Sequence, residues 1–315
     1  MSRTRIVFCG TPQFAVPSLK HLLEQKDFEI AGAFTQPDRP RGRGQEISYS
    51  PVKEIALAEN IPVFQPVKVR APEVQEQLRK LAPEVIVIIA YGQIIPARLL
   101  GIPKHGWINL HASLLPKYRG AAPINWAIVN GETRTGLTTM RIDAGMDTGE
   151  MLLQEELAIG ADETAPELMG RLAEAGAPLM AKTLRGLVAG TMTGRAQSHA
   201  EATLAPPLKR EDGRIEWTGS TQEIYNRMRG FAPWPGAYTE FRGQTCHLWG
   251  KPVSNEKVEE TPGTILASRN TVRVACGGGS LLELANVKLE GRKEVTATGF
   301  ANGARLRAGE RFGKQ

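Results

Sequence analysis

The chain has 315 residues, 41% hydrophobic and 23% charged, which is enough for two globular domains with cores of their own. It contains no run of about 18 apolar residues, so we expect no membrane-spanning helix and no membrane partner. The net charge of +6 lies almost entirely in residues 206–315, with 17 Lys and Arg against 12 Asp and Glu, whereas residues 1–205 hold 22 against 21.

The first half of the chain alternates apolar strands with helical stretches, the pattern of a parallel α/β sheet. Residues 85–89 are apolar throughout, which is typical of a strand buried on both faces. Ser50 followed by Pro51 predicts the start of a helix. We expect strands at 5–9, 28–34, 61–64, 85–89, 106–110 and 137–142, and helices at 13–25, from 51, at 72–81 and at 164–188, the last broken near 176–178.

The second half changes character after residue 189. Residues 190–213 are rich in Gly, Thr, Ala and Pro and lack apolar periodicity, which predicts a linker. Short strands alternating with turns then predict a small β-barrel, at 237–242, 245–250, 263–267, 271–275 and 280–289. We therefore expect an α/β domain at 1–189, a linker at 190–210 and a barrel domain at 211–315.

Cysteine usage points to the compartment. Cys9, Cys246 and Cys276 are far apart and form no CxxC or Cys/His cluster, so we expect a reducing cytosol and no metal. The chain begins without a secretory or transit signal, which favours a bacterial cytosol. Cys9 as a catalytic nucleophile is disfavoured, because buried cysteines are common at the end of such strands.

Ligands of open α/β sheets bind beyond the carboxyl ends of the strands. The first such loop, Gly10-Thr11-Pro12, lacks the three-glycine dinucleotide fingerprint, which disfavours an NAD-dependent dehydrogenase. A later segment places Arg39, Arg41 and Arg43 two residues apart amid Gly and Pro, so no stable helix or central strand is expected there. Such a loop can bind phosphates and base edges, or can be an exposed basic loop without a partner.

Two further loops carry polar residues. Asn109 and His111 are two residues apart, so on a strand their side chains point the same way. A lone His is more often structural, and an Asn beside it at a strand's carboxyl end shifts that balance toward catalysis, so both roles stay open for His111 at this point. Asp143 and Asp147 lie among glycines, and either could be a turn residue. The EF-hand spacing is absent, which disfavours calcium.

The segment HASLLPKYRGAAP at residues 111–123, with Asn109 before it and DAGMDTG at 143–149 after it, resembles the signature of folate-dependent formyltransferases. TQPDRPRGRG at 35–44, AYGQIIP at 90–96, FAPWPG at 231–236 and PGTI at 262–265 are similar to motifs of those members that act on a tRNA. The resemblance runs from about residue 5 to about residue 310. It implies a Rossmann-like formyltransferase domain followed by an OB-like, tRNA-binding barrel.

The resemblance also implies a reaction: formyl transfer from 10-formyltetrahydrofolate to the α-amino group of methionine on initiator Met-tRNA, for translation initiation. Asn109 would donate a hydrogen bond to the developing oxyanion. His111 would also donate to it, and Asp147 would orient the imidazole and accept or relay the proton. The folate-contacting residues implied are Ser113, Leu114, Leu115, Pro116, Tyr91 and Gly92.

For the tRNA, the resemblance implies that Arg39, Arg41 and Arg43 enter the acceptor stem, where initiator tRNA lacks a normal first base pair and is cheaper to open. The basic barrel would hold phosphates, which positions the tRNA without reading its sequence. Lys209 and Arg210 supply positive charge in the linker, where Pro207 stands in place of the family's usual Lys. We expect a monomer.

Two alternatives remain open. One is a formyltransferase acting on a small nucleotide or nucleotide-sugar amine, which could use the same Asn, His and Asp but would need neither the arginine loop nor a basic barrel. The other is a non-catalytic RNA-binding protein. The presence of Asn109, His111 and Asp147 together argues against it.

Overall fold

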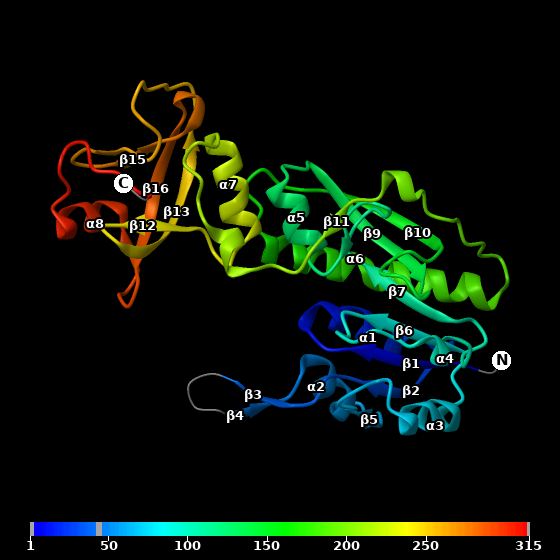
Figure 1. Ribbon diagram of the computed structural model, residues 1–315. Coiled ribbons are helices and arrows are strands. Elements are labelled where there is room, and N and C mark those ends of the chain that lie inside the picture. Colours follow the sequence, from blue (N-terminus) through cyan, green and yellow to red (C-terminus); the bar gives the residue numbers. More distant parts are fainter. Residues whose placement is uncertain (1–2, 42–45, 314–315) are drawn as a thin grey trace. The chain divides into compact units, whose positions relative to one another are not determined.

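The computed structural model describes residues 3–41 and 46–313 (Figure 1). The chain divides into two compact units. The first comprises residues 1–123, 134–158 and 168–206, and the second comprises residues 124–133, 159–167 and 207–315.

A seven-stranded sheet in the order β10-β9-β7-β6-β1-β2-β5 forms the centre of the first unit. The five strands from β7 to β5 are parallel, whereas β9 runs antiparallel to β7 and β10 antiparallel to β9. The strands are β1 (Thr4–Gly10), β2 (Phe28–Phe34), β5 (Val63–Phe64), β6 (Val85–Ile89), β7 (Trp107–His111), β9 (Arg134–Arg141) and β10 (Met151–Ala158). The prediction of a Rossmann-like, mostly parallel sheet is confirmed.

Helices cover the sheet (Figure 1). They are α1 (Val16–Glu24), preceded by the 3-10 turn η1 (Gln13–Ala15), α2 (Pro51–Ala58), α3 (Pro72–Leu81), α4 (Ala97–Leu100) and α6 (Ala165–Val188). Val7 of β1 packs in one apolar cluster with Val74 and Leu78 of α3, and Ala33 of β2 packs in another with Ala56 of α2. Every residue of β6 is buried, as the apolar run at 85–89 predicts.

The start of α2 follows the prediction from Ser50 and Pro51. The Ser50 hydroxyl accepts a hydrogen bond from the Lys53 backbone N–H at 3.1 Å, and Pro51 occupies the first helical position.

The predicted break in the long helix near 176–178 is wrong, because α6 is continuous from Ala165 to Val188. Pro178 is exposed, so the Glu174 carbonyl that it leaves without a backbone donor lies on the solvent side. Gly176 is buried, and a Cβ there would approach the Leu110 side chain to 2.4 Å. The glycine therefore marks a close helix-to-strand contact rather than a helix end.

Two small sheets accompany the main one. β3 (Arg39–Arg41) pairs antiparallel with β4 (Glu46–Ser48), forming a two-stranded ribbon outside the seven-stranded sheet. β8 (Arg119–Gly120) pairs in parallel with β11 (Leu204–Ala205). Met151 also forms a bridge with Arg195. Residues 190–206, although without apolar periodicity, are thus bound to the first unit by backbone pairing.

The second unit is built on an antiparallel sheet in the order β12-β13-β16-β15-β14, with β17 paired to β16. Its elements are α5 (Pro123–Val129), η3 (Arg210–Gly213), α7 (Thr221–Gly230), β12 (Tyr238–Phe241), β13 (Gln244–Val253), β14 (Ile265–Ala267), β15 (Val272–Ala275), η4 (Gly277–Gly279), β16 (Leu281–Leu289), β17 (Val295–Thr296) and α8 (Ala297–Ala304). The 3-10 turn η2 (His199–Glu201) belongs to the first unit. The predicted barrel and all five of its expected strands are confirmed.

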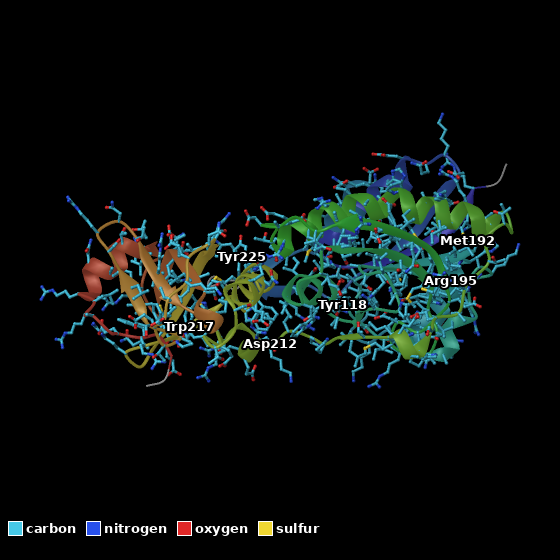
Figure 2. All side chains as sticks on the ribbon, turned by 90° about the horizontal axis from the view of Figure 1, so that it is seen from above. Tyr118, Met192, Arg195, Asp212, Trp217 and Tyr225 are labelled. Atoms are coloured by element: carbon cyan, nitrogen blue, oxygen red, sulfur yellow. The ribbon has the colours of Figure 1, made fainter. Side chains whose placement is uncertain are left out.

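Aromatic side chains fill the core of this barrel. Trp217, labelled in Figure 2, stacks on Phe312 with ring centroids 5.7 Å apart, and Phe241 contacts both Phe300 and Phe312. No helix among the described residues is long and apolar enough to span a membrane.

Candidate active site

His111 is the last residue of β7 and is 5% exposed. Its Nε2 lies 2.9 Å from the Tyr118 carbonyl oxygen. A carbonyl can only accept, so this hydrogen bond places a proton on Nε2. The Nδ1 atom is then the nitrogen that remains able to take up a proton.

Asp147 reaches His111 from the loop after β9. Its Oδ2 lies 3.7 Å from His111 Nδ1, which is too long for a hydrogen bond. The carboxylate at this distance attracts the imidazole when the ring carries a second proton. The Gly120 backbone N–H donates to the same oxygen at 2.9 Å. A proton taken up at Nδ1 would therefore face a carboxylate that is itself held by a backbone donor.

Asn109 precedes His111 by two residues on β7 and is half-buried. It is paired with Ile88 of β6 and with Met140 of β9. Alternation along the strand puts its side chain on the same face as His111. An amide donor and an imidazole thus share one face at the carboxyl end of β7.

Asp143, the other carboxylate of the loop, binds its own turn. Its Oδ1 accepts from the Gly145 N–H at 3.0 Å, and its two oxygens accept from the Thr148 hydroxyl at 2.8 and 2.9 Å. This is the turn role that the sequence left open for it.

The loops after β1 and β6 meet where the strand order changes direction around β1, the usual place for a ligand crevice in such sheets. The Tyr91 carbonyl accepts from the Thr11 hydroxyl at 3.3 Å and from Gln36 Nε2 at 3.0 Å. Gly92 follows with φ of 84°, exposed to solvent. The Tyr91 carbonyl is thus engaged within the chain, and the exposed backbone of Gly92 follows it at this end of the sheet.

The Tyr91 ring belongs to the core, since the residue is 1% exposed and packs in a cluster with Cys9 and Ile88. Burial raises the pKa of Tyr91 above its usual range. Among the described atoms its hydroxyl has no hydrogen-bond partner. The side chain can therefore border a folate site only indirectly.

The segment after His111 divides into buried and accessible residues. Ser113 is fully buried and its hydroxyl donates to the Lys117 carbonyl at 2.6 Å, and Leu115 is 3% exposed. Leu114 and Pro116 are half-buried. Of the four, only Leu114 and Pro116 have side-chain surface available to a ligand.

The ribbon β3–β4 begins with Arg39, which is exposed. Arg41 has its backbone in β3, and its side chain lies outside the described part, as does the whole of Arg43. Asp38, just before the ribbon, forms an ion pair with Lys53 of α2 and accepts from Gln65 Nε2 at 2.9 Å. The residue that precedes the β3–β4 ribbon is thus bound to α2.

Lys209 and Arg210 are exposed at the start of η3, where the Lys209 N–H donates to Asp212 Oδ2 at 2.7 Å. Burial and the nearby cations Lys288 and Arg210 lower the pKa of His247 in the same unit. Two carboxylates, Glu211 and Asp212, follow Lys209 and Arg210 directly in η3.

The three cysteines are free and buried. Burial raises the pKa of the Cys246 and Cys276 thiols to about 12, and that of Cys9 further still. None is suited to act as a nucleophile. The described residues contain no group of three or more metal-ligating side chains.

Two buried residues that the sequence did not predict hold the Asp147 loop. They are Arg119 and Gln197. Gln197 Nε2 donates to the carbonyls of Asp147 and Gly149, and its Oε1 accepts from Arg119. No periodic signal marks Gln197, because it lies in the segment predicted as a linker. The burial of Gln197 depends on contacts with residues far away in the chain, so its local sequence does not indicate it.

Two family models match successive parts of the chain. Residues 4–184 match the family model described as formyl transferase, and residues 207–305 match that of the formyl transferase C-terminal domain. The chain is 54% identical to the methionyl-tRNA formyltransferase of Solibacter usitatus, over 98% of this chain and 99% of the relative. The chain belongs to the methionyl-tRNA formyltransferase family. The Geobacter sulfurreducens member is 49% identical over 100% of this chain and 98% of its own length.

Solved structures share the fold of this formyltransferase. WlaRD, a sugar 3N-formyl transferase crystallised with dTDP and 5-N-formyl-THF, matches 93% of this chain and all of its own, with a TM-score of 0.66 at 20% identity. HypX from Aquifex aeolicus in complex with tetrahydrofolic acid matches 95% of this chain and 47% of its own, with a TM-score of 0.64 at 16% identity.

Proposed function

We propose that the chain transfers the formyl group of 10-formyltetrahydrofolate to the α-amino group of methionine on initiator Met-tRNA, giving N-formylmethionyl-tRNA for translation initiation. The observation that carries the proposal is the His111–Asp147 pair at the end of β7, in a chain 54% identical to a methionyl-tRNA formyltransferase over nearly its whole length.

The site residues divide the chemistry of acyl transfer. Asn109 donates from its amide to the formyl oxygen, where negative charge develops. His111, with Nε2–H fixed on the Tyr118 carbonyl, presents Nδ1 toward the reacting groups and Asp147. Asp147 orients the imidazole and accepts or relays the proton that the attacking amine loses. The bond between the formyl carbon and N10 of the donor then breaks, and N10 of the departing tetrahydrofolate takes up a proton.

The donor is proposed to bind in the crevice formed by the loops after β1, β6 and β7. The half-buried Leu114 and Pro116 supply apolar wall, and the exposed backbone of Gly92 supplies polar groups. Tyr91 positions Gly92 through its carbonyl, which accepts from Thr11 and Gln36. Ser113 and Leu115 support this wall from the interior. Two solved proteins of the same fold carry folate compounds, which supports a folate donor here.

The tRNA is proposed to contact both basic regions. Arg39 and Arg41 of the ribbon, together with Arg43, reach the acceptor stem, and Lys209 and Arg210 bind phosphates. The barrel domain, residues 211–315 after a linker at 190–210, holds the body of the tRNA, while residues 1–189 carry the chemistry. We further propose a monomer, acting without metal in the bacterial cytosol, in line with the bacterial sources of the relatives.

The test is formyl transfer by the purified protein from 10-formyltetrahydrofolate to four acceptors in parallel: initiator Met-tRNA, elongator Met-tRNA, free methionine and glycinamide ribonucleotide. We expect product on initiator Met-tRNA and, at the same enzyme concentration, little on the other three. Transfer to glycinamide ribonucleotide instead would replace the proposed acceptor by a small amine. RNA binding without transfer to any acceptor would overturn the enzymatic proposal.

A further inference from the structure

Asp147 has a strained backbone conformation, which hydrogen bonds from residues around it stabilise. Its φ of 53° lies in the left-handed region, which residues other than glycine seldom occupy. Gly120 binds the carboxylate, and the Gln197 Nε2 amide donates to the carbonyl oxygens of Asp147 and Gly149, each at 2.8 Å. One amide group therefore fixes the loop on both sides of Thr148.

The other end of the Gln197 side chain is held by Arg119. Gln197 Oε1 accepts from Arg119 Nε at 3.0 Å and from Nη2 at 2.7 Å. A guanidinium only donates, so this contact fixes which end of the amide faces the loop. The two residues are 7% and 6% exposed, which keeps water from competing for these hydrogen bonds.

Arg119 lies in the short segment that also touches both members of the candidate catalytic pair. The carbonyl of Tyr118 accepts from His111, and the N–H of Gly120 donates to Asp147. This segment is in turn bound by the strand β11, through β8, and by the Thr203 carbonyl, which accepts from the Arg119 N–H at 2.8 Å. Figure 2 labels Tyr118 at this segment.

We propose that Gln197 and Arg119 are positioning residues for formyl transfer: Arg119 orients the Gln197 amide, and the amide holds the Asp147 loop so that the carboxylate faces His111 Nδ1. The inference rests on the proposed function. It assigns a role in the reaction to a segment that lacks any periodic sequence signal.

Gln197→Glu keeps the contact of residue 197 with Arg119 and removes its contacts with the Asp147 loop. The carboxylate still accepts from Arg119, so the buried guanidinium keeps its partner. It cannot donate to the Asp147 and Gly149 carbonyls, and its charge repels them. We expect kcat on initiator Met-tRNA to fall on the order of 10²-fold, as for a small misplacement of a reacting group, with KM for tRNA and donor changed less than about threefold.

Gln25→Glu is the matched control. Gln25 also bridges a guanidinium and a backbone carbonyl, accepting from Arg185 at 2.7 Å and donating to the His21 carbonyl at 3.1 Å, but at the end of α1 and away from Asp147. It should leave kcat unchanged. Loss of activity in both variants alike would overturn the inference, because the cause would be the charge change itself.

A double-mutant cycle distinguishes positioning from general structural support. If Gln197 acts through Asp147, Gln197→Glu should change kcat less than about twofold in an Asp147→Asn background. A full additional loss in that background would show that Gln197 acts elsewhere, and would overturn the inference.

Hydrogen exchange keeps the inference separable from the proposed function. The Gly120 amide proton, bonded to Asp147, should exchange at least about tenfold faster in Gln197→Glu than in the wild type or in Gln25→Glu. If the wild type formylates no acceptor while Gly120 exchange is faster, the proposed function fails and the positioning contact stands. Unchanged Gly120 exchange would overturn the inference.

Discussion

Single backbone groups organise the candidate site at the scale of residues. The Tyr118 carbonyl sets the tautomer of His111, and the Gly120 N–H sets the direction of the Asp147 carboxylate. The spacing of two residues on a strand predicted that Asn109 and His111 share a face, whereas the approach of Asp147 to them was implied by the resemblance to the formyltransferases. The sequence could not predict these main-chain partners, or Gln197, since they depend on contacts between residues far apart in the chain.

The two aspartates of the loop give a direct test of their separate roles. Asp147→Asn removes the negative charge beside His111, and we expect kcat to fall by about 10²–10⁴-fold, the usual range for loss of a proton-transfer group. Asp143→Asn keeps an amide oxygen for the Gly145 N–H and Thr148, so its kcat should stay within about threefold of wild type. Steady-state kinetics on initiator Met-tRNA measures both, and equal losses would contradict the division of roles.

Asp38 and Lys53 predict a pH effect on stability. Burial opposes ionisation of Asp38, but the hydrogen bonds from Lys53 and Gln65 outweigh it and lower its pKa. Because the pKa of Asp38 is lower in the folded state, its ionisation stabilises the fold at pH values above the unfolded-state pKa of about 4. This stabilisation is lost as the pH falls through the folded-state pKa. Lys53→Met should lower the free energy of unfolding by about 1–3 kcal/mol at pH 7.

Urea unfolding of Lys53→Met and of the wild type at pH 7 and pH 3 tests whether the stabilisation by Lys53 decreases as pH falls. The difference between the two proteins should narrow at pH 3 as Asp38 becomes protonated. A difference of the same size at pH 7 and pH 3 would mean that Lys53 stabilises through its packing on Tyr49, over whose ring its Nζ lies 3.9 Å from the centroid.

At the scale of elements, periodicity and turn residues predicted most of the fold. The five barrel strands and the strand at 85–89 were predicted because their apolar pattern is local. β10 was missed because its centre, Gln154, Glu155 and Glu156, is exposed and charged, and it is a strand only through pairing with β9. The predicted break in α6 was wrong because Gly176 serves helix packing.

Substitution by Ala should have opposite effects on stability at Gly176 and at Gly170 of α6. In Gly176→Ala the new methyl would approach buried Leu110, next to His111, to 2.4 Å. Overpacking of about 1–3 kcal/mol should outweigh the helix-propensity gain of at most about 1 kcal/mol, so stability falls. Gly170 has open space around its Cβ position, so Gly170→Ala should be neutral or stabilising by up to about 1 kcal/mol.

Thermal and urea unfolding of the two glycine variants measures this contrast. A Gly176→Ala protein more stable than wild type would show that Leu110 yields, and that the glycine is not required for the helix-to-strand contact.

At the scale of the whole molecule, charge is divided as the proposed function requires. The first 205 residues are nearly neutral and the last 110 carry most of the net positive charge. Phosphate contacts release counterions, so affinity for tRNA should fall steeply with salt. This division was visible in the sequence, but the residues that touch the tRNA were not, because charge alone does not distinguish a binding surface from a solvated one.

Salt dependence tests the linker cations. Replacing Lys209 and Arg210 together by Ala should weaken binding of initiator Met-tRNA and reduce the slope of log affinity against log salt by about 2, or about 1 for each lost phosphate contact. Lys20→Ala, an exposed cation of α1, should leave the slope unchanged. Fluorescence titrations between 50 and 200 mM salt, concentrations on the order of those where such slopes are resolved, provide the measurement. An unchanged slope in the double variant would exclude these two residues from the interface.

The most direct measurement of the central claim is the single-turnover rate of formyl transfer to initiator Met-tRNA, at saturating donor and tRNA, for wild type and His111→Ala. We expect formylation by the wild type, and in the variant a rate lower by about 10²–10⁴-fold with the Kd for tRNA within about twofold, because His111 acts on the reacting groups and not on the tRNA backbone. A variant that forms product at the wild-type rate would contradict the assignment of this site.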